Sequence, residues 1–290
     1  MLVLYGLGTT IGAGIYALTG EVAASAGASA PLSFLLAAIL AGAAGLGFAE
    51  LAGRLPKAAG EAVFVEHAFA SRPVTTAVGT AVVAAGVISA AAITNAFGGY
   101  MSELIEAPRL VLVGGQAVAL GAIAVSGAKE SVGAAAVITV IEIGGLLLVV
   151  WAGRHRLADI GGEIGNIFGP PTGRHAWSGV LGGSFLAFFA FPGFEDIDAV
   201  AEETDDASVN LPRAILITLI TTTAVYLVVS TVAVLTVDPV ELGRSDAPLV
   251  LGPLVQGATP SRPLPPRAPS RVRGSVLRCS TSRPRRGGNQ

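Results

Sequence analysis

The chain has 290 residues, of which 52% are hydrophobic and 13% are charged. This composition excludes an ordinary soluble domain and indicates a membrane protein. The net charge of -2 hides an uneven distribution, because residues 1–257 carry 10 Lys and Arg against 20 Asp and Glu, whereas residues 258–290 carry 8 Arg and no acidic residue. The single cysteine, Cys279, excludes an intrachain disulfide and a multi-cysteine metal site.

Seven segments are apolar enough to cross a bilayer, which takes about 20 residues each. They are closely spaced and show no strand-like alternation, so the sequence predicts an all-α polytopic membrane protein. Asn210, which precedes Leu211 and Pro212, predicts the start of the last helix. Lys and Arg are divided evenly between the two sets of loops, so charge bias does not fix the orientation. The predicted spans are residues 2–24, 32–52, 77–100, 110–127, 132–153, 178–198 and 213–237.

The first span contains four glycines, in GLGTTIGAG at residues 6–14. Glycines loosen a helix and leave backbone N–H and C=O groups open at mid-membrane depth, where lipid cannot satisfy them. We therefore expect these groups to line a cavity, in which amides at the start of a half-helix suit a carboxylate. Close helix packing through Gly8 and Gly12 is the alternative. We reject the interpretation of these glycines as a dinucleotide-binding turn, because the following residues form two long apolar stretches without strands.

The sixth span is interrupted by Pro192 and Gly193. Proline removes a backbone donor and glycine adds freedom, so we expect the helix to break there. Glu195 follows at once. An ionisable group at this depth is either part of a functional site or a carboxylate that binds freed backbone groups at a helix end. Phe191 and Phe194 flank the break and are candidates for closing over a substrate.

Four stretches of the chain resemble the amino acid–polyamine–organocation (APC) superfamily of amino acid permeases. The most specific is the fourth, because a broken aromatic helix followed by EET and NLPRA is hard to obtain by composition alone. The similarity runs from the first residues to about Pro248 or Val255. The four stretches are GLGTTIGAGIY at residues 6–16, PKAAGEAVFVEHAF at 56–69, SGAKES at 126–131 and SFLAFFAFPGFEDIDAVAEETDDASVNLPRA at 184–214.

The resemblance implies a LeuT-type fold of two inverted five-helix repeats, whose first helices, the first and sixth spans, are broken at the substrate site. The two breaks inferred from glycine and proline occupy these positions. The resemblance further implies that the first break holds the substrate carboxylate, and that the second supplies carbonyl groups for the amino group and aromatic rings for a gate. The substrate-binding residues implied in this way are Ile11, Gly12, Ala13, Gly14, Ile15, Ala190, Phe191, Gly193 and Phe194.

We therefore expect a secondary active transporter of the plasma membrane that moves amino acids or related amines by alternating access. Its expected partners are the substrate, a coupling proton or an exchanged substrate, and the lipid bilayer. We expect no enzyme activity, cofactor, metal ion or nucleic acid. The alternative is a seven-helix receptor or another non-transport membrane protein. A retinal protein is excluded because no lysine lies in any predicted span.

Two acidic residues are candidates for proton coupling. The position of Glu195 resembles that of an acidic residue linked to proton coupling in some antiporters of the superfamily. Glu142 lies at the centre of the fifth span, where an ionisable group is a functional candidate by default. Glu142 could equally form a hydrogen bond with a broken helix.

The sequence departs from the family pattern near residue 257. Two five-helix repeats need at least ten spans and seven are predicted, so we expect an incomplete LeuT-type fold. Residues 258–290 are rich in Pro, Arg and Ser and contain no candidate span. We expect a disordered basic tail, either one that binds anionic lipid or, as we favour, the product of a truncated or frameshifted reading frame. We expect the 290-residue chain to transport poorly or not at all.

Overall fold

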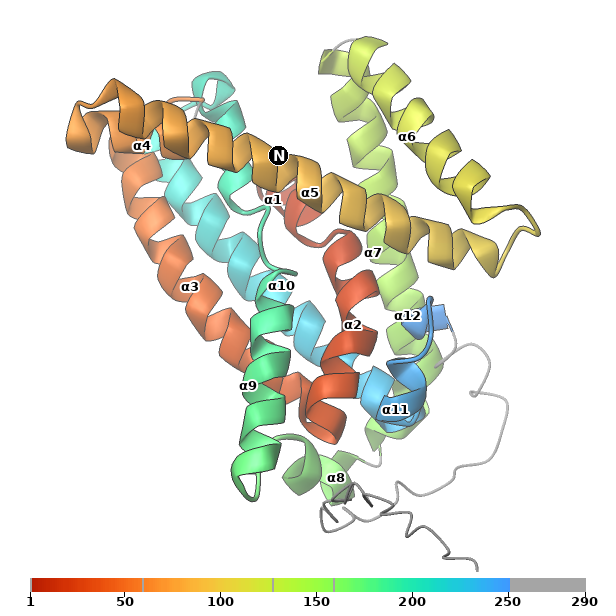
Figure 1. The fold of residues 1–290 in the computed structure, drawn as a ribbon. Helices are drawn as coiled ribbons and strands as arrows, with labels where there is room; N and C mark the ends of the chain where they lie inside the picture. Colours follow the sequence, from red (N-terminus) through yellow and green to blue (C-terminus); the bar gives the residue numbers. More distant parts are fainter. Residues whose placement is uncertain (1, 59, 127, 159, 251–290) are drawn as a thin grey trace, which may run out of the picture. The chain divides into compact units, whose positions relative to one another are not determined.

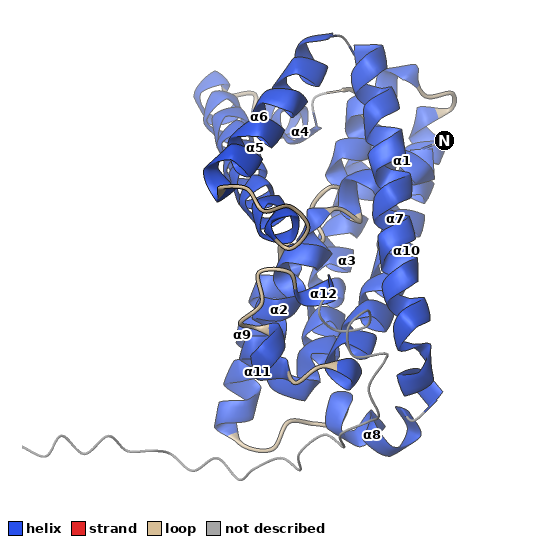
Figure 2. Cartoon of the chain, turned by 90° about the vertical axis from the view of Figure 1, so that its right-hand side faces the viewer, coloured by secondary structure: helices blue, strands red, loops and turns tan. Residues whose placement is uncertain are grey.

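The computed structural model describes residues 2–58, 60–126, 128–158 and 160–250. These residues form α-helices and two 3-10 segments, and no strand occurs among them. Figure 2 shows this all-helical architecture. The fold class is therefore that of an all-α membrane protein, as the sequence predicts. The basic tail, residues 258–290, lies outside the described residues.

The first predicted span is divided into two helices. Helix α1 covers Leu2–Thr10 and α2 covers Ala13–Ala26, with Ile11 and Gly12 between them. The 3-10 turn η1, Gly27–Ser29, then leads into α3, Ala30–Arg54. Gly27 has a φ of 61°, which glycine adopts without the strain that a Cβ would cause. The chain reverses at this turn, so α2 and α3 run in opposite directions (Figure 1).

The middle of the chain contains the next three predicted spans and two helices that the sequence analysis missed. The first missed helix, α4, covers Gly60–Phe69, and the second, α8, covers Ile160–Ile167. Both are too short to cross a membrane, so a search for long apolar stretches passes over them. Helix α5 runs obliquely in front of α1 and α2 in Figure 1. The three spans correspond to α5 (Arg72–Ser102), α6 (Arg109–Ser126) and α7 (Ala128–Ala158).

The sixth predicted span is also divided. Helix α9 covers Arg174–Phe188, an irregular segment follows, and the 3-10 segment η2 covers Glu195–Glu203. The chain continues into the long helix α10, Ala207–Thr236. Two short helices follow at its end, α11 (Pro239–Leu242) and α12 (Pro248–Val250).

The predicted start of the last span at Asn210 is wrong, because α10 begins three residues earlier. Asp206, in a left-handed conformation with a φ of 47°, precedes the helix. Asn210 lies within the first turn, where its Nδ2 donates to the carbonyl oxygen of Asp205 at 2.7 Å. Pro212 follows inside the helix, where it removes one backbone hydrogen bond. Because proline is common at the first position of a helix, Pro212 suggested a start just before it, and the predicted boundary was therefore too late.

Four helical stretches of the described residues are long and apolar enough to cross a membrane. One of them joins α2 to α3 across the reversal at η1, so it supplies two antiparallel segments. The two broken spans are divided into pieces that are individually too short to cross. Helix α6 contains a shorter apolar stretch, Arg109–Val125. The four stretches are Gly14–Arg54, Arg72–Ser102, Val137–Leu157 and Ala207–Thr236.

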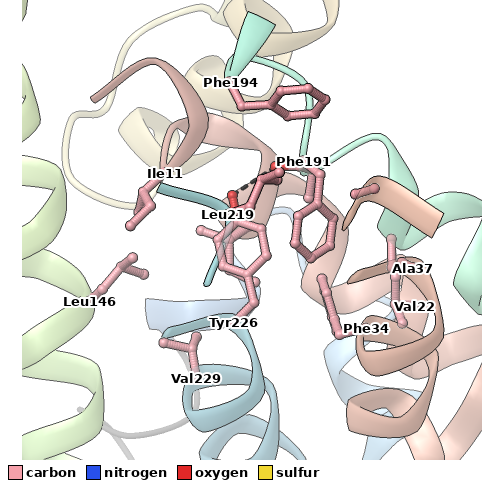
Figure 3. Packing of buried hydrophobic residues seen from close by; sticks show 14 of the residues in the cluster. Ile11, Val22, Phe34, Ala37, Leu146, Phe191, Phe194, Leu219, Tyr226 and Val229 are labelled. Atoms are coloured by element: carbon pink, nitrogen blue, oxygen red, sulfur yellow. Dashed lines mark hydrogen bonds between the residues drawn. The ribbon is translucent and has the colours of Figure 1, made fainter. Parts of the chain in front are cut away.

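The core lies around α10 and α3, which pack closely against each other. Helix α10 also contacts α1, α7 and η2, while α9 packs against both α2 and α3. Figure 3 shows the centre of this core, where the rings of Phe34, Phe191 and Tyr226 meet. Tyr226 lies 5.1 Å from Phe191 and 5.9 Å from Phe34 between ring centroids. These aromatic side chains bring α3, α10 and the broken sixth span together, and so position the two helix breaks.

Candidate functional site

The first break exposes polar backbone groups inside the helical bundle. Helix α1 ends with the Ile11 N–H, which donates to the carbonyl oxygen of Leu7 at 2.7 Å. Gly12 is extended, with φ -107° and ψ -152°, and no side chain caps the start of α2. The first N–H groups of a helix have no intrahelical acceptor. The N-terminus of α2 therefore presents free donors, with the positive end of its dipole, at the break.

The second break lies between Phe188 and Glu195. Three hydrogen-bonded turns of the 3-10 type follow α9, the last of them from the Phe191 N–H to the carbonyl oxygen of Phe188 at 3.1 Å. Pro192 has no N–H, and Gly193 has a φ of 125°, a conformation that residues with a Cβ rarely adopt. The helix therefore stops here for the reason that the sequence predicts.

The two breaks lie against each other, backbone to backbone. A Cβ placed on Gly14 would lie 2.9 Å from the Cα of Ala190, and one placed on Gly193 would lie 2.9 Å from the Cα of Thr10. Both distances are too short for a real carbon contact. The Oγ1 of Thr9 also donates to the carbonyl oxygen of Gly193 at 2.7 Å. Glycine is thus required at both positions, because only a residue without a side chain allows this approach.

Tyr226 of α10 joins the two breaks, and the sequence analysis missed it. Its hydroxyl lies 2.7 Å from the carbonyl oxygen of Thr10 and 2.7 Å from that of Ala190. A hydroxyl has one proton to donate, so the two carbonyl groups share it. The side chain is completely buried. A tyrosine in the middle of an apolar span was the available signal, because a buried tyrosine hydroxyl needs a partner.

Glu195, one of the two predicted proton-coupling residues, lies directly on the second break. Its Oε2 accepts a hydrogen bond from the Gly193 N–H at 2.7 Å. The carboxylate thus accepts a hydrogen bond from a backbone N–H that the break leaves without a helical acceptor. The same side chain is half-buried.

Glu142, the other candidate, lies on α7 beside α2. Its backbone carbonyl accepts a hydrogen bond from the Tyr16 hydroxyl at 2.6 Å. Tyr16 lies on α2, two residues after Gly14. The backbone carbonyl of Tyr16 in turn accepts from the Tyr100 hydroxyl of α5 at 2.9 Å. The side chain of Glu142 is half-buried. The structure therefore places Glu195 at the second break and Glu142 beside α2, which begins at the first break.

The predicted gate residues differ in their surroundings. Phe191 is buried against Tyr226, and Phe194 packs on Phe48 of α3 with 5.7 Å between ring centroids. The side chains of Phe185 and Phe189 are exposed, so they do not pack into the contact between the two breaks. Figure 3 shows Phe191 and Phe194 near the hydroxyl of Tyr226.

The arrangement places opposite partial charges side by side, because the two breaks contact each other. Free N–H groups at the start of α2 attract an anion, and carbonyl groups at the second break attract a cation. No group of three or more His, Cys, Asp or Glu side chains suited to a metal ion occurs among the described residues. The geometry therefore suits a small zwitterion, with apolar walls from the buried aromatic residues.

The sequence profile of the amino acid permease family matches residues 2–259. The chain belongs to this family. The resemblance to APC permeases is thereby confirmed, and the two broken spans of this permease chain lie where that fold has its helix breaks.

Individual relatives agree with this assignment. The chain is 32% identical over 254 residues to the vacuolar cationic amino acid transporter 2 of Arabidopsis thaliana, with 80% of this chain and 39% of the relative covered. It is 28% identical over 263 residues to the human cationic amino acid transporter 4, with 81% and 40% covered. An uncharacterized transporter of Mycobacterium tuberculosis is 29% identical over 283 residues, with 89% and 58% covered. The chain thus spans about two fifths of the length of the cationic amino acid transporters that it matches.

Proposed function

We propose that this permease chain contributes the substrate site of a secondary active transporter, which moves amino acids or related amines across the membrane by alternating access. The observation that carries the proposal is the contact between the two helix breaks. Gly14 and Gly193 let the breaks approach backbone to backbone, so that groups of both charges face one small region. Such breaks at the membrane midplane are the usual ion and substrate sites of secondary transporters.

A zwitterionic amino acid fits this region by charge. Its carboxylate would bind the free N–H groups after Gly12, within residues 11–15, where the positive end of the α2 dipole lies. Its ammonium group would bind carbonyl oxygens of the second break, at Ala190, Phe191, Gly193 and Phe194. Both ends are then neutralised by fixed dipoles, without a buried ion pair and its desolvation cost. The rings of Phe191 and Phe194 would cover the bound substrate.

Cationic amino acids are the first substrates to test. The named relatives from Arabidopsis thaliana and human are cationic amino acid transporters. L-arginine and L-lysine carry the same zwitterionic head group as other amino acids and differ in the side chain. We place the transporter in the plasma membrane, with a proton or an exchanged substrate as its coupling partner. Glu195 and Glu142 are the residues that we propose for proton coupling.

A binding measurement on a glycine variant tests the proposed site. The 290-residue chain is purified, placed in lipid nanodiscs and titrated with labelled L-arginine. Gly14→Leu places a side chain against Ala190 and is expected to lower the affinity at least tenfold, because it pushes the two breaks apart. Gly47→Leu is the matched control, since no atom lies within 4 Å of its would-be Cβ.

The two variants separate the outcomes. Loss of binding in Gly14→Leu with normal binding in Gly47→Leu supports the proposal. Equal affinity in Gly14→Leu and the unmodified chain would show that the carboxylate site lies elsewhere.

A further inference from the structure

The two tryptophans of the chain occupy equivalent positions on consecutive spans. Trp151 lies near the end of α7, and Trp177 lies near the start of α9. An arginine follows the first by three residues and precedes the second by three, so WAGR at residues 151–154 is mirrored by RHAW at 174–177. In both pairs the arginine lies closer to the end of its helix. A tryptophan with a basic residue on its outer side is typical of a membrane–water interface.

Both pairs belong to the end of the bundle that carries α8. This short helix joins the end of α7 to the start of α9, and it contacts α7 and α3. Figure 1 shows α8 at the lower end of the drawn chain, beside the start of α9. The isoleucines of α8, at positions 160, 164 and 167, share one helix face, on which Ile167 is buried and Ile164 is exposed. A short amphipathic helix of this kind suits a position along the membrane surface.

The guanidinium group of Arg154 is held on the face of the Trp151 ring. Its Cζ lies 4.3 Å from the ring centroid, a distance at which a cation is attracted to the ring. Its Nη1 also donates to the backbone carbonyl oxygen of Trp151 at 2.7 Å. Both side chains are exposed. The stacking therefore orients the guanidinium plane and leaves its other N–H groups open to a ligand.

The same face of α7 is apolar on the inner side of this pair. Val140 and Leu147 are exposed. Their spacing from Trp151 and Arg154, in steps of seven, four and three residues, places all four side chains on one side of the helix. They lie within Val137–Leu157, which is long and apolar enough to cross a membrane. The order from apolar to aromatic to basic matches the order of acyl chain, interface and headgroup in a lipid leaflet.

The arginines of the two pairs have no acidic partner among the described residues. The ion pairs found in that part of the chain involve other arginines. Glu163, the acidic residue of α8, accepts a hydrogen bond from the side chain of Asn166 at 2.8 Å. The positive charges of Arg154 and Arg174 are therefore available to an external anion, beside two exposed aromatic rings.

We propose that Arg154 and Arg174, with the tryptophans beside them, bind the phosphate groups of anionic phospholipids. Guanidinium groups bind phosphate oxygens through paired, charge-assisted hydrogen bonds. Indole rings at the interface pack against the first part of the acyl chains. An anionic headgroup is favoured over phosphatidylcholine, because the choline group of the latter carries a positive charge that offsets the attraction. The inference does not depend on the proposed transport function, because lipid binding is measured without an amino acid.

The fluorescence of a single tryptophan tests the site. Trp177→Phe leaves Trp151 as the only tryptophan of the full chain, which is reconstituted into phosphatidylcholine vesicles. A fixed fraction of the lipid is replaced by phosphatidylglycerol or by phosphatidylcholine with brominated acyl chains, which quench an indole ring on contact. We expect phosphatidylglycerol to occupy the site about threefold to fivefold more strongly. Arg154→Gln should abolish this preference. Arg213→Gln, which removes an exposed arginine of α10, is the matched control and should retain it.

The second pair is tested in the same way. Trp151→Phe leaves Trp177, and Arg174→Gln in this background should abolish the preference for phosphatidylglycerol. Soluble glycerol phosphate in excess should leave the quenching unchanged, because it has no acyl chains to pack on the ring. Several results would overturn the proposal. These are equal quenching by the two lipids when both arginines are present, a preference that persists in Arg154→Gln, an equal loss in Arg213→Gln, and displacement by glycerol phosphate, which would identify a site for small anions.

Discussion

Individual backbone groups define the candidate site more than side chains do. Gly193 adopts a φ of 125° and lies against the backbone of Thr9 and Thr10, while Gly14 lies against Ala190. A Cβ at either position would force the two breaks apart. Tyr226 then supplies the one hydroxyl proton that the carbonyl groups of Thr10 and Ala190 share. At this scale, two glycines and one tyrosine set the geometry in which a zwitterion is expected to bind.

The hydroxyl of Tyr226 should matter for substrate affinity. Tyr226→Phe keeps the ring that packs on Phe191 and removes the donor to both breaks. A hydrogen bond of this kind contributes about 1 kcal/mol, so we expect affinity for L-arginine to fall about fivefold to tenfold. Equilibrium binding in nanodiscs measures this. Tyr5→Phe is the control, because the Tyr5 hydroxyl forms no hydrogen bond with another described residue. A similar loss in both variants would refute the specific role of Tyr226.

Gly193 should be intolerant of any side chain. Gly193→Ala combines an unfavourable positive φ with a collision against Thr9, and we expect it to destabilise the fold by about 1–3 kcal/mol. Thermal unfolding in detergent gives the change. Gly144→Ala, where a Cβ meets no atom within 4 Å, should leave the melting temperature the same or slightly higher. Normal stability of Gly193→Ala would contradict the close contact of the two breaks.

At the scale of elements, the sequence predicted the two broken helices well. Gly12 and the Pro192–Gly193 pair interrupt their helices through local backbone chemistry, and both signals can be recognised in the sequence. The start of α10 was misplaced, because the left-handed Asp206 that precedes it carries no strong sequence signal. The role of Tyr226 depends on contacts between segments far apart in the chain, which local patterns do not encode.

Glu195 provides a prediction at the element scale. Its carboxylate accepts a hydrogen bond from the Gly193 N–H and so stabilises the start of η2. Glu195→Gln retains an oxygen acceptor, so we expect substrate binding close to that of the unmodified chain. Glu195→Ala leaves the Gly193 N–H without this partner and should weaken binding severalfold. Isothermal titration of both variants distinguishes them, and equal losses in Gln and Ala would point to the charge instead.

At the scale of the described molecule, packing is uneven. Helices α3, α9 and α10 bury many residues against one another, whereas the most apolar stretch of α5, within Arg72–Ser102, is not buried at all. An exposed apolar helix in a membrane protein is expected to face lipid or another helix. Within the described residues, the helices of this chain leave this surface of α5 uncovered.

Lipid access should therefore differ between α5 and α10. In nanodiscs that contain a lipid with a photoreactive diazirine group, we expect strong labelling of the exposed apolar face around Val83, Val87 and Ile88. The buried stretch from Val229 to Thr236 should show little labelling. Peptide mass spectrometry locates the adducts. Equal labelling of the two stretches would contradict the packing described above.

The central claim is that the two helix breaks together bind an amino acid by both charged ends. The most direct test compares three ligands on the purified chain in nanodiscs by isothermal titration calorimetry. These are L-arginine, its methyl ester, which lacks the carboxylate, and 5-guanidinopentanoic acid, which lacks the α-amino group. We predict that L-arginine binds and that each analogue binds at least tenfold more weakly. Binding of either analogue as tightly as L-arginine would contradict the account.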